Sequence, residues 1–170
     1  MKKAIILSAA MVYLLGASVS FVYAGGGGGS SECASVASLG TAADFSLSGT
    51  GGENISLKGL RGKDVILFFW ASWCPNCLRE ISVMNDIYRK LEKDNTRLLA
   101  ISVGEDPDKI RRFAQRRKLD FPVFLDGDQV VASSYRIFGI PTYFVVDKQG
   151  EIRFRGHYFP GDYKKYVCGK

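Results

Sequence analysis

The chain has 170 residues, of which 46% are hydrophobic and 24% are charged, and its formal net charge is +6. This length suits one ordinary domain with an appendage, and the composition excludes collagen-like, disordered and multispanning membrane proteins. The four cysteines are too few for a small disulfide-stapled scaffold, so only their spacing can indicate their use.

The first 24 residues predict a targeting segment, a signal peptide, rather than part of a fold. Lys2 and Lys3 precede a long apolar run. The run ends in Val22-Tyr23-Ala24, which has small residues at the two positions that a signal peptidase recognises. The alternative is an uncleaved anchor, because about 21 residues rising ~1.5 Å each can cross a hydrocarbon layer of about 30 Å. Both interpretations place the remainder outside the cytoplasm, in the periplasm, with a flexible Gly/Ser-rich tether over residues 25–40 and one folded domain over residues 41–170.

Hydrophobic patterning predicts alternating strands and helices along this domain. A Gly-rich turn between residues 45–47 and 55–57 predicts a short hairpin, and the unbroken apolar run 65–70 predicts a strand that is buried on both faces. Helical spacing of apolar residues follows from Ile81 to Leu91. The remaining expected elements are a strand over 97–103, a helix opened by Pro107, a strand over 121–125, a short helix over 128–135, and strands over 142–147 and 152–155.

This order predicts an α/β fold with a central mixed sheet flanked by helices on both faces. The sheet is expected to be parallel at its centre and to end in an antiparallel pair, because a tight turn joins the last two strands. The basic run between Arg111 and Lys118 is interpreted as the solvated face of a helix, so no nucleic-acid partner is expected.

The strongest chemical signal is the motif Trp73-Cys74-Pro75-Asn76-Cys77, which lies where a buried strand ends and a helix begins. Two intervening residues bring the sulfurs within bonding reach across the first helical turn. At a helix N-terminus, unpaired N–H groups and the helix dipole favour the thiolate, which is the species that attacks disulfides. We therefore expect Cys74 to be the nucleophile and the more buried Cys77 to resolve the mixed disulfide.

Other uses of a CxxC pair are weaker. A zinc site needs a second pair of ligands, whereas His157 is the only histidine and Cys33 and Cys168 stand alone. Covalent haem attachment needs histidine directly after the second cysteine, where this chain has Leu78. A structural disulfide would close too small a loop to be useful. We expect no metal and no cofactor.

The segment FWASWCPNC, the downstream Gly139-Ile140-Pro141-Thr142 and the charged turn before the last hairpin resemble the thioredoxin superfamily. The added N-terminal β-hairpin and the exported context resemble its TlpA/ResA-like branch. The resemblance implies a thioredoxin-like fold and a cis peptide bond at Pro141, which faces the dithiol. It also implies a substrate-contact surface made of Trp73, Pro75, Ile140 and Pro141.

The resemblance further assigns a proton-handling role to Glu80, because an acidic residue stands at this place in the branch. Glu80 lies three residues after Cys77 on the same helical face, where a carboxylate can accept the proton that Cys77 must lose. The alternative is a surface glutamate paired with Arg79 or Lys58. Phe68 occupies the position where many thioredoxins carry a buried acid, so that route for proton transfer is absent and the role of Glu80 is favoured. Ser82 replaces a proline that usually kinks the helix.

Cys33 and Cys168 flank the domain, and in an oxidising compartment an even leftover pair usually forms a disulfide. Some members of the branch tie their termini in this way. We expect a structural Cys33–Cys168 disulfide; otherwise Cys33 is a free thiol on a tether, which can pair with another chain.

These observations predict an extracytoplasmic thiol-disulfide oxidoreductase that reduces disulfides of protein substrates. The branch implies apocytochrome c as client. Because no soluble reductant pool exists outside the cytoplasm, we expect a transmembrane thiol donor as reductant. We also expect a monomer that meets the membrane only if residues 4–24 remain as an anchor. The alternatives are a disulfide oxidase or isomerase, because sequence does not resolve the redox potential, and a copper-binding assembly factor on the same fold. That last class uses a CxxxC pair with a distant histidine, unlike the spacing here.

Overall fold

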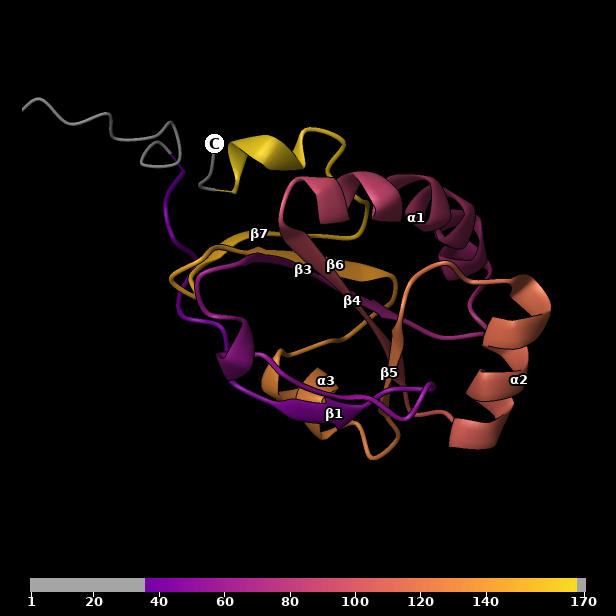
Figure 1. Ribbon diagram of the computed structural model, residues 1–170. Helices are drawn as coiled ribbons and strands as arrows, with labels where there is room; N and C mark the ends of the chain where they lie inside the picture. Colours follow the sequence, from indigo (N-terminus) through magenta and orange to yellow (C-terminus); the bar gives the residue numbers. More distant parts are fainter. Residues whose placement is uncertain (1–35, 168–170) are drawn as a thin grey trace, which may run out of the picture.

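The computed structural model describes residues 36–167 (Figure 1). The predicted signal segment, most of the tether, and both Cys33 and Cys168 lie outside the described residues, so the structure does not test those predictions. Within residues 36–167, no helix combines the length and the hydropathy that a membrane span requires.

The N-terminal hairpin predicted from the Gly-rich turn is present. Strands β1 (Ser46–Ser48) and β2 (Asn54–Ser56) pair antiparallel and form a small sheet of their own. Its turn meets the main sheet through β5, because the backbone N–H of Thr50 donates to the carbonyl of Val123 over 2.8 Å. The hairpin is therefore an addition that packs beside the main sheet.

The main sheet has five strands in the order β5–β4–β3–β6–β7. Strand β3 lies at its centre, parallel to β4 and antiparallel to β6, and β5 and β7 form the two edges. The strands are β3 (Asp64–Trp70), β4 (Thr96–Val103), β5 (Val123–Asp126), β6 (Thr142–Val146) and β7 (Ile152–Gly156). The predicted mixed sheet is confirmed, and its parallel half ends at β3.

Strand β3 alternates between two apolar cores, as the two-residue period of a strand requires. Ile66, Phe68 and Trp70 face one core, whereas Val65, Leu67 and Phe69 face the other, and all are at most 1% exposed. This burial on both faces explains why residues 65–70 form an unbroken apolar run.

Helices cover both faces of the sheet (Figure 1). Helices α1 (Pro75–Lys93) and α2 (Pro107–Arg117) bury Met84, Leu91 and Ile110 in the first core. Helix α3 (Val130–Ser134) and the 3-10 helix η2 (Lys58–Leu60) pack on the second core, and a second 3-10 helix, η3 (Tyr163–Lys165), follows β7. Sequence reading did not predict the two 3-10 helices.

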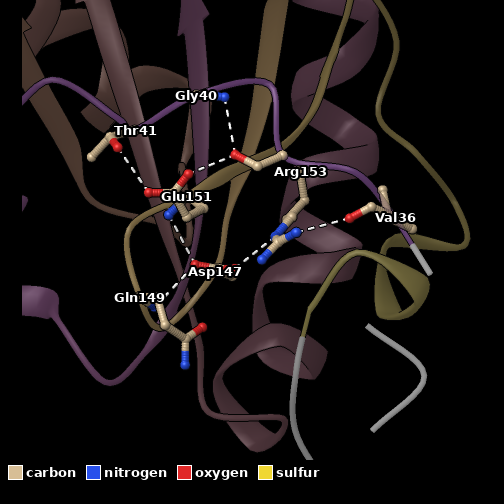
Figure 2. Close-up of polar contacts among 8 residues, drawn as sticks. Val36, Gly40, Thr41, Asp147, Gln149, Glu151 and Arg153 are labelled. Atoms are coloured by element: carbon tan, nitrogen blue, oxygen red, sulfur yellow. Dashed lines mark hydrogen bonds and ion pairs between the residues drawn. The ribbon is translucent and has the colours of Figure 1, made fainter. Parts of the chain in front are cut away.

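A polar clamp ties the N-terminal segment to the β6–β7 hairpin (Figure 2). The buried Asp147 carboxylate accepts the backbone N–H groups of Gln149 and Glu151, each over 2.9 Å, and pairs with Arg153 over 2.7 Å. Arg153 in turn donates to the carbonyl of Val36 over 2.8 Å. The clamp therefore fixes the start of the described chain against the β6–β7 hairpin.

Candidate active site

The two motif cysteines lie at the junction of β3 and α1. Cys74 is the N-cap residue of α1, with Pro75 in the first turn, where a missing N–H costs nothing. Its Sγ accepts the backbone N–H of Cys77 over 3.3 Å, and the two sulfurs are 2.6 Å apart. The sequence prediction that the motif brings both sulfurs together across the first helical turn is therefore matched by the geometry.

The two thiols differ in environment. Cys74 is 5% exposed and Cys77 is fully buried. Burial raises the pKa of the Cys77 thiol to about 12, and the hydrogen bond with Cys74 acts in the same direction. Cys77 is therefore a protonated thiol at neutral pH, and it can act as a nucleophile only after it transfers its proton to a base.

The Pro141 loop faces the dithiol. The Ile140–Pro141 peptide bond is cis, and the Ile140 carbonyl lies 3.6 Å from the Cys74 Sγ. Trp73, next to the nucleophile in sequence, is 64% exposed, whereas Trp70 at the end of β3 is fully buried. An exposed indole and an accessible Pro75 therefore border Cys74, while the other tryptophan belongs to the core.

Glu80 points its carboxylate toward the sheet. The Tyr143 hydroxyl on β6 donates to the Glu80 Oε2 over 3.0 Å, while Arg79 donates to Asn76 instead. Tyr143 is fully buried and stacks on Phe68 with ring centroids 4.7 Å apart. Its pKa is raised well above the ordinary range by burial, by the Glu80 charge and hydrogen bond, and by the charge of Cys77. The phenol therefore stays protonated and remains a donor to Glu80.

A cavity of about 220 Å³ opens beside these groups. Its lining comes from the start of α1 and from the loops before β6 and after β7: Asn76, Arg79, Glu80, Gly139, Ile140, Pro141, His157 and Tyr158. The His157 Nδ1 lies 2.9 Å from the Pro141 carbonyl and 3.3 Å from the Thr142 Oγ1. Three predicted residues, Glu80, Ile140 and Pro141, thus share one cavity.

Sequence reading missed three residues around this site: Tyr143, His157 and Glu105. Tyr143 was part of an apolar run that predicted only a strand, and His157 was weighed only as a metal ligand. Glu105 follows β4 and binds the loop that precedes Cys74, with 2.6 Å between its Oε2 and the Ser72 N–H nitrogen. No pattern in the sequence signals a contact between positions 33 residues apart.

Comparison with known proteins agrees with this geometry. A family profile described as the AhpC/TSA family matches residues 39–155. Thiol-disulfide oxidoreductase ResA of Geobacillus kaustophilus is 38% identical over 122 residues, which cover 72% of this chain and 70% of that protein.

Two solved structures share the fold. A putative thiol:disulfide interchange protein DsbE from Chlorobium tepidum has a TM-score of 0.67 at 27% identity, over 77% of this chain and 92% of that one. StoA from Bacillus subtilis has a TM-score of 0.64 at 28% identity, over 74% of this chain and 96% of that one. The chain therefore belongs to the AhpC/TSA family and, within its thioredoxin-like members, to the TlpA/ResA-like thiol-disulfide oxidoreductases.

Proposed function

We propose that this oxidoreductase works outside the cytoplasm, in the periplasm, where it reduces disulfides in protein substrates. The Cys74 thiolate attacks one substrate sulfur, forms a mixed disulfide and releases the other sulfur as a thiolate. The Cys77 thiolate then attacks the Cys74 sulfur, which releases the reduced substrate and leaves a Cys74–Cys77 disulfide. Two electrons pass to the substrate, and a membrane thiol donor restores the dithiol.

The asymmetric burial of the two thiols carries this proposal. Cys74 keeps a small exposed area of 5%, whereas Cys77 has none, and Cys74 is bordered by Ile140 and the exposed Trp73, so a substrate disulfide can approach its sulfur from that side. Cys77 is fully buried behind it, so an incoming substrate meets only one sulfur. The neighbouring sulfur, 2.6 Å away, is placed for the second attack.

We assign the proton of Cys77 to Glu80. The second step needs a base, because burial holds the pKa of Cys77 at about 12. Glu80 follows Cys77 by three residues, one turn along α1, and its carboxylate is oriented by Tyr143 over 3.0 Å. A protonated phenol cannot itself accept a proton, which leaves the Glu80 carboxylate as the acceptor within this pair.

The location and the client rest on the N-terminal sequence and on the relatives. The signal-like residues 1–24 support export. Apocytochrome c as substrate, and with it a role in cytochrome c maturation, is carried over from the resemblance to the TlpA/ResA-like branch and is part of this proposal. The dithiol must be regenerated after each turnover, and for a protein outside the cytoplasm we propose that a transmembrane thiol donor does this. We propose a monomer with Trp73, Pro75, Ile140 and Pro141 as its substrate-contact surface.

The test is to trap mixed disulfides in the native host. Cys77→Ser removes the resolving thiol, so the substrate should stay attached to Cys74 and be identifiable by mass spectrometry. Cys74→Ser is the matched control and should trap nothing. If only Cys74→Ser captures partners, the two roles are reversed.

The direction is tested by the reduction potential of the Cys74–Cys77 pair. A value near that of thioredoxin, about −270 mV, supports a reductase, whereas one near the oxidase DsbA, about −120 mV, would show that the protein introduces disulfides.

A further inference from the structure

A buried carboxylate lies beneath the loop that leads into the nucleophile, outside the cavity described above. Glu105 follows β4, and its side chain is only 1% exposed. Its Oε2 accepts the Ser72 backbone N–H over 2.6 Å, and its Oε1 accepts the Ser72 hydroxyl over 2.6 Å. Both oxygens therefore hold one residue, which stands two positions before Cys74.

Further partners complete this carboxylate. The Ser102 hydroxyl of β4 donates to Oε2 over 3.1 Å, and the Lys109 ammonium lies 2.8 Å from Oε1. The Asp106 side chain accepts the backbone N–H of Lys109 over 2.9 Å and caps α2. This cap fixes the first turn of α2, which positions the Lys109 ammonium beside Glu105. A buried carboxylate that receives four donors is fully satisfied and rigid.

Glu105 is ionised despite its burial. Burial by itself raises the pKa of this carboxyl, but the hydrogen bonds from Lys109 and Ser72 outweigh it, and the pKa lies below its ordinary value. An ionised acceptor forms the shorter and stronger kind of hydrogen bond. The negative charge of Glu105 therefore holds the Ser72 backbone in place and does not serve in proton transfer.

The held segment is the short connection between β3 and α1. Strand β3 ends at Trp70, which pairs with Ser102, and α1 begins at Pro75, so residues 71–74 form the whole connection. Within it, the Cys74 N–H donates to the Ala71 carbonyl over 3.2 Å, which closes a tight turn. Ser72 lies inside that turn, and Glu105 binds both its N–H and its hydroxyl.

We propose that Glu105 is a positioning residue of the oxidoreductase: through Ser72 it sets where the Cys74 sulfur stands relative to the α1 N-terminus and to Ile140. It acts on the loop and does not touch the reacting sulfurs. Thiolate attack requires alignment of the sulfur, and a misplacement of about 1 Å can slow a reaction about 100-fold. The proposal uses only the thiol chemistry of Cys74 and does not depend on the substrate or the direction proposed above.

The test measures the alkylation rate of Cys74 by iodoacetamide across a pH series, read on the Cys74 peptide by mass spectrometry. Glu105→Ala should slow alkylation about tenfold or more and shift its pH profile. Glu105→Gln should recover part of the rate, because its amide oxygen still accepts the Ser72 N–H. Ser72→Ala, which loses only the hydroxyl bond, should fall between Glu105→Gln and the wild type.

Asp147→Ala is the matched control, because Asp147 is another buried carboxylate that holds backbone N–H groups, at the β6–β7 turn. It should lower thermal stability yet leave Cys74 alkylation within about twofold of the wild type, since it lies outside the machinery around Cys74. Equal slowing by Asp147→Ala would show a general loss of structure and overturn the proposal. Wild-type alkylation rates in both Ser72→Ala and Glu105→Gln would overturn it as well, even if Glu105→Ala does not fold.

Discussion

Replacing Glu80 by glutamine removes the proposed base while it keeps the shape of the side chain. An amide oxygen can still accept the Tyr143 hydroxyl, which lies 3.0 Å from the carboxylate in the wild type. The variant therefore changes proton transfer more than packing. In reduced protein, the first thiol–disulfide step at Cys74 should be nearly unaffected, and the second step at Cys77 should slow.

The magnitude follows from the pKa of Cys77, which is about 12. At pH 7 the Cys77 thiol is therefore almost entirely protonated, and it must lose its proton before it attacks. A positioned general base typically contributes about 10²–10⁴ in rate. We expect Glu80→Gln to slow the resolving step at least about 100-fold at neutral pH, and the residual rate to rise about tenfold per pH unit.

Stopped-flow reaction with Ellman's reagent separates the two steps. Reduced protein releases one yellow thiolate when Cys74 attacks the reagent and a second when Cys77 displaces the first adduct. A background with Cys33→Ser and Cys168→Ser leaves only the motif thiols to react. Cys77→Ser in the same background should show the first release alone, which identifies the two phases.

Glu92→Gln is the matched control for this prediction. Glu92 also lies on α1 and also accepts a tyrosine hydroxyl, that of Tyr88, over 2.9 Å, but it stands four turns from the motif. Its second phase should match the wild type. The reasoning is refuted if Glu80→Gln resolves the adduct at the wild-type rate, or if Glu92→Gln slows it equally.

Four further outcomes are expected. Leu91→Ala in the first core should cost about 2–5 kcal/mol in the free energy of unfolding, measured in urea, without changing the reduction potential. Trp73→Ala should leave stability within about 0.5 kcal/mol, because the indole is 64% exposed, yet slow the reduction of a protein disulfide more than that of a small disulfide. The lowered pKa of Glu105 should stabilise the fold above its unfolded value of about 4.3 and lose that contribution as the pH falls below it; Glu105→Gln should flatten the acid limb of a stability–pH curve. In a Cys74→Ser, Cys77→Ser background, intact mass after alkylation without reductant should show no added alkyl group, because Cys33 and Cys168 form a disulfide; two added alkyl groups would contradict it.

Sequence patterning was sufficient for most of the fold. The apolar run 65–70 predicted the central strand, and the alternation of strands and helices predicted the mixed sheet with its N-terminal hairpin. These elements are visible in sequence because burial imposes a period on neighbouring residues. The 3-10 helix at Tyr163–Lys165 was missed, since three residues carry no period to detect.

The site divides in the same way. The sequence by itself determined the chemistry. Two cysteines at a strand–helix junction, with Glu80 one turn later, are close in the chain, so their spacing is visible in the sequence. Only the tertiary structure decided which groups surround them. Tyr143 meets Glu80 across 63 residues, and Glu105 meets Ser72 across 33, because β6 and β4 flank β3 in the sheet. Such contacts depend on the order of the strands in the sheet, which local spacing does not encode.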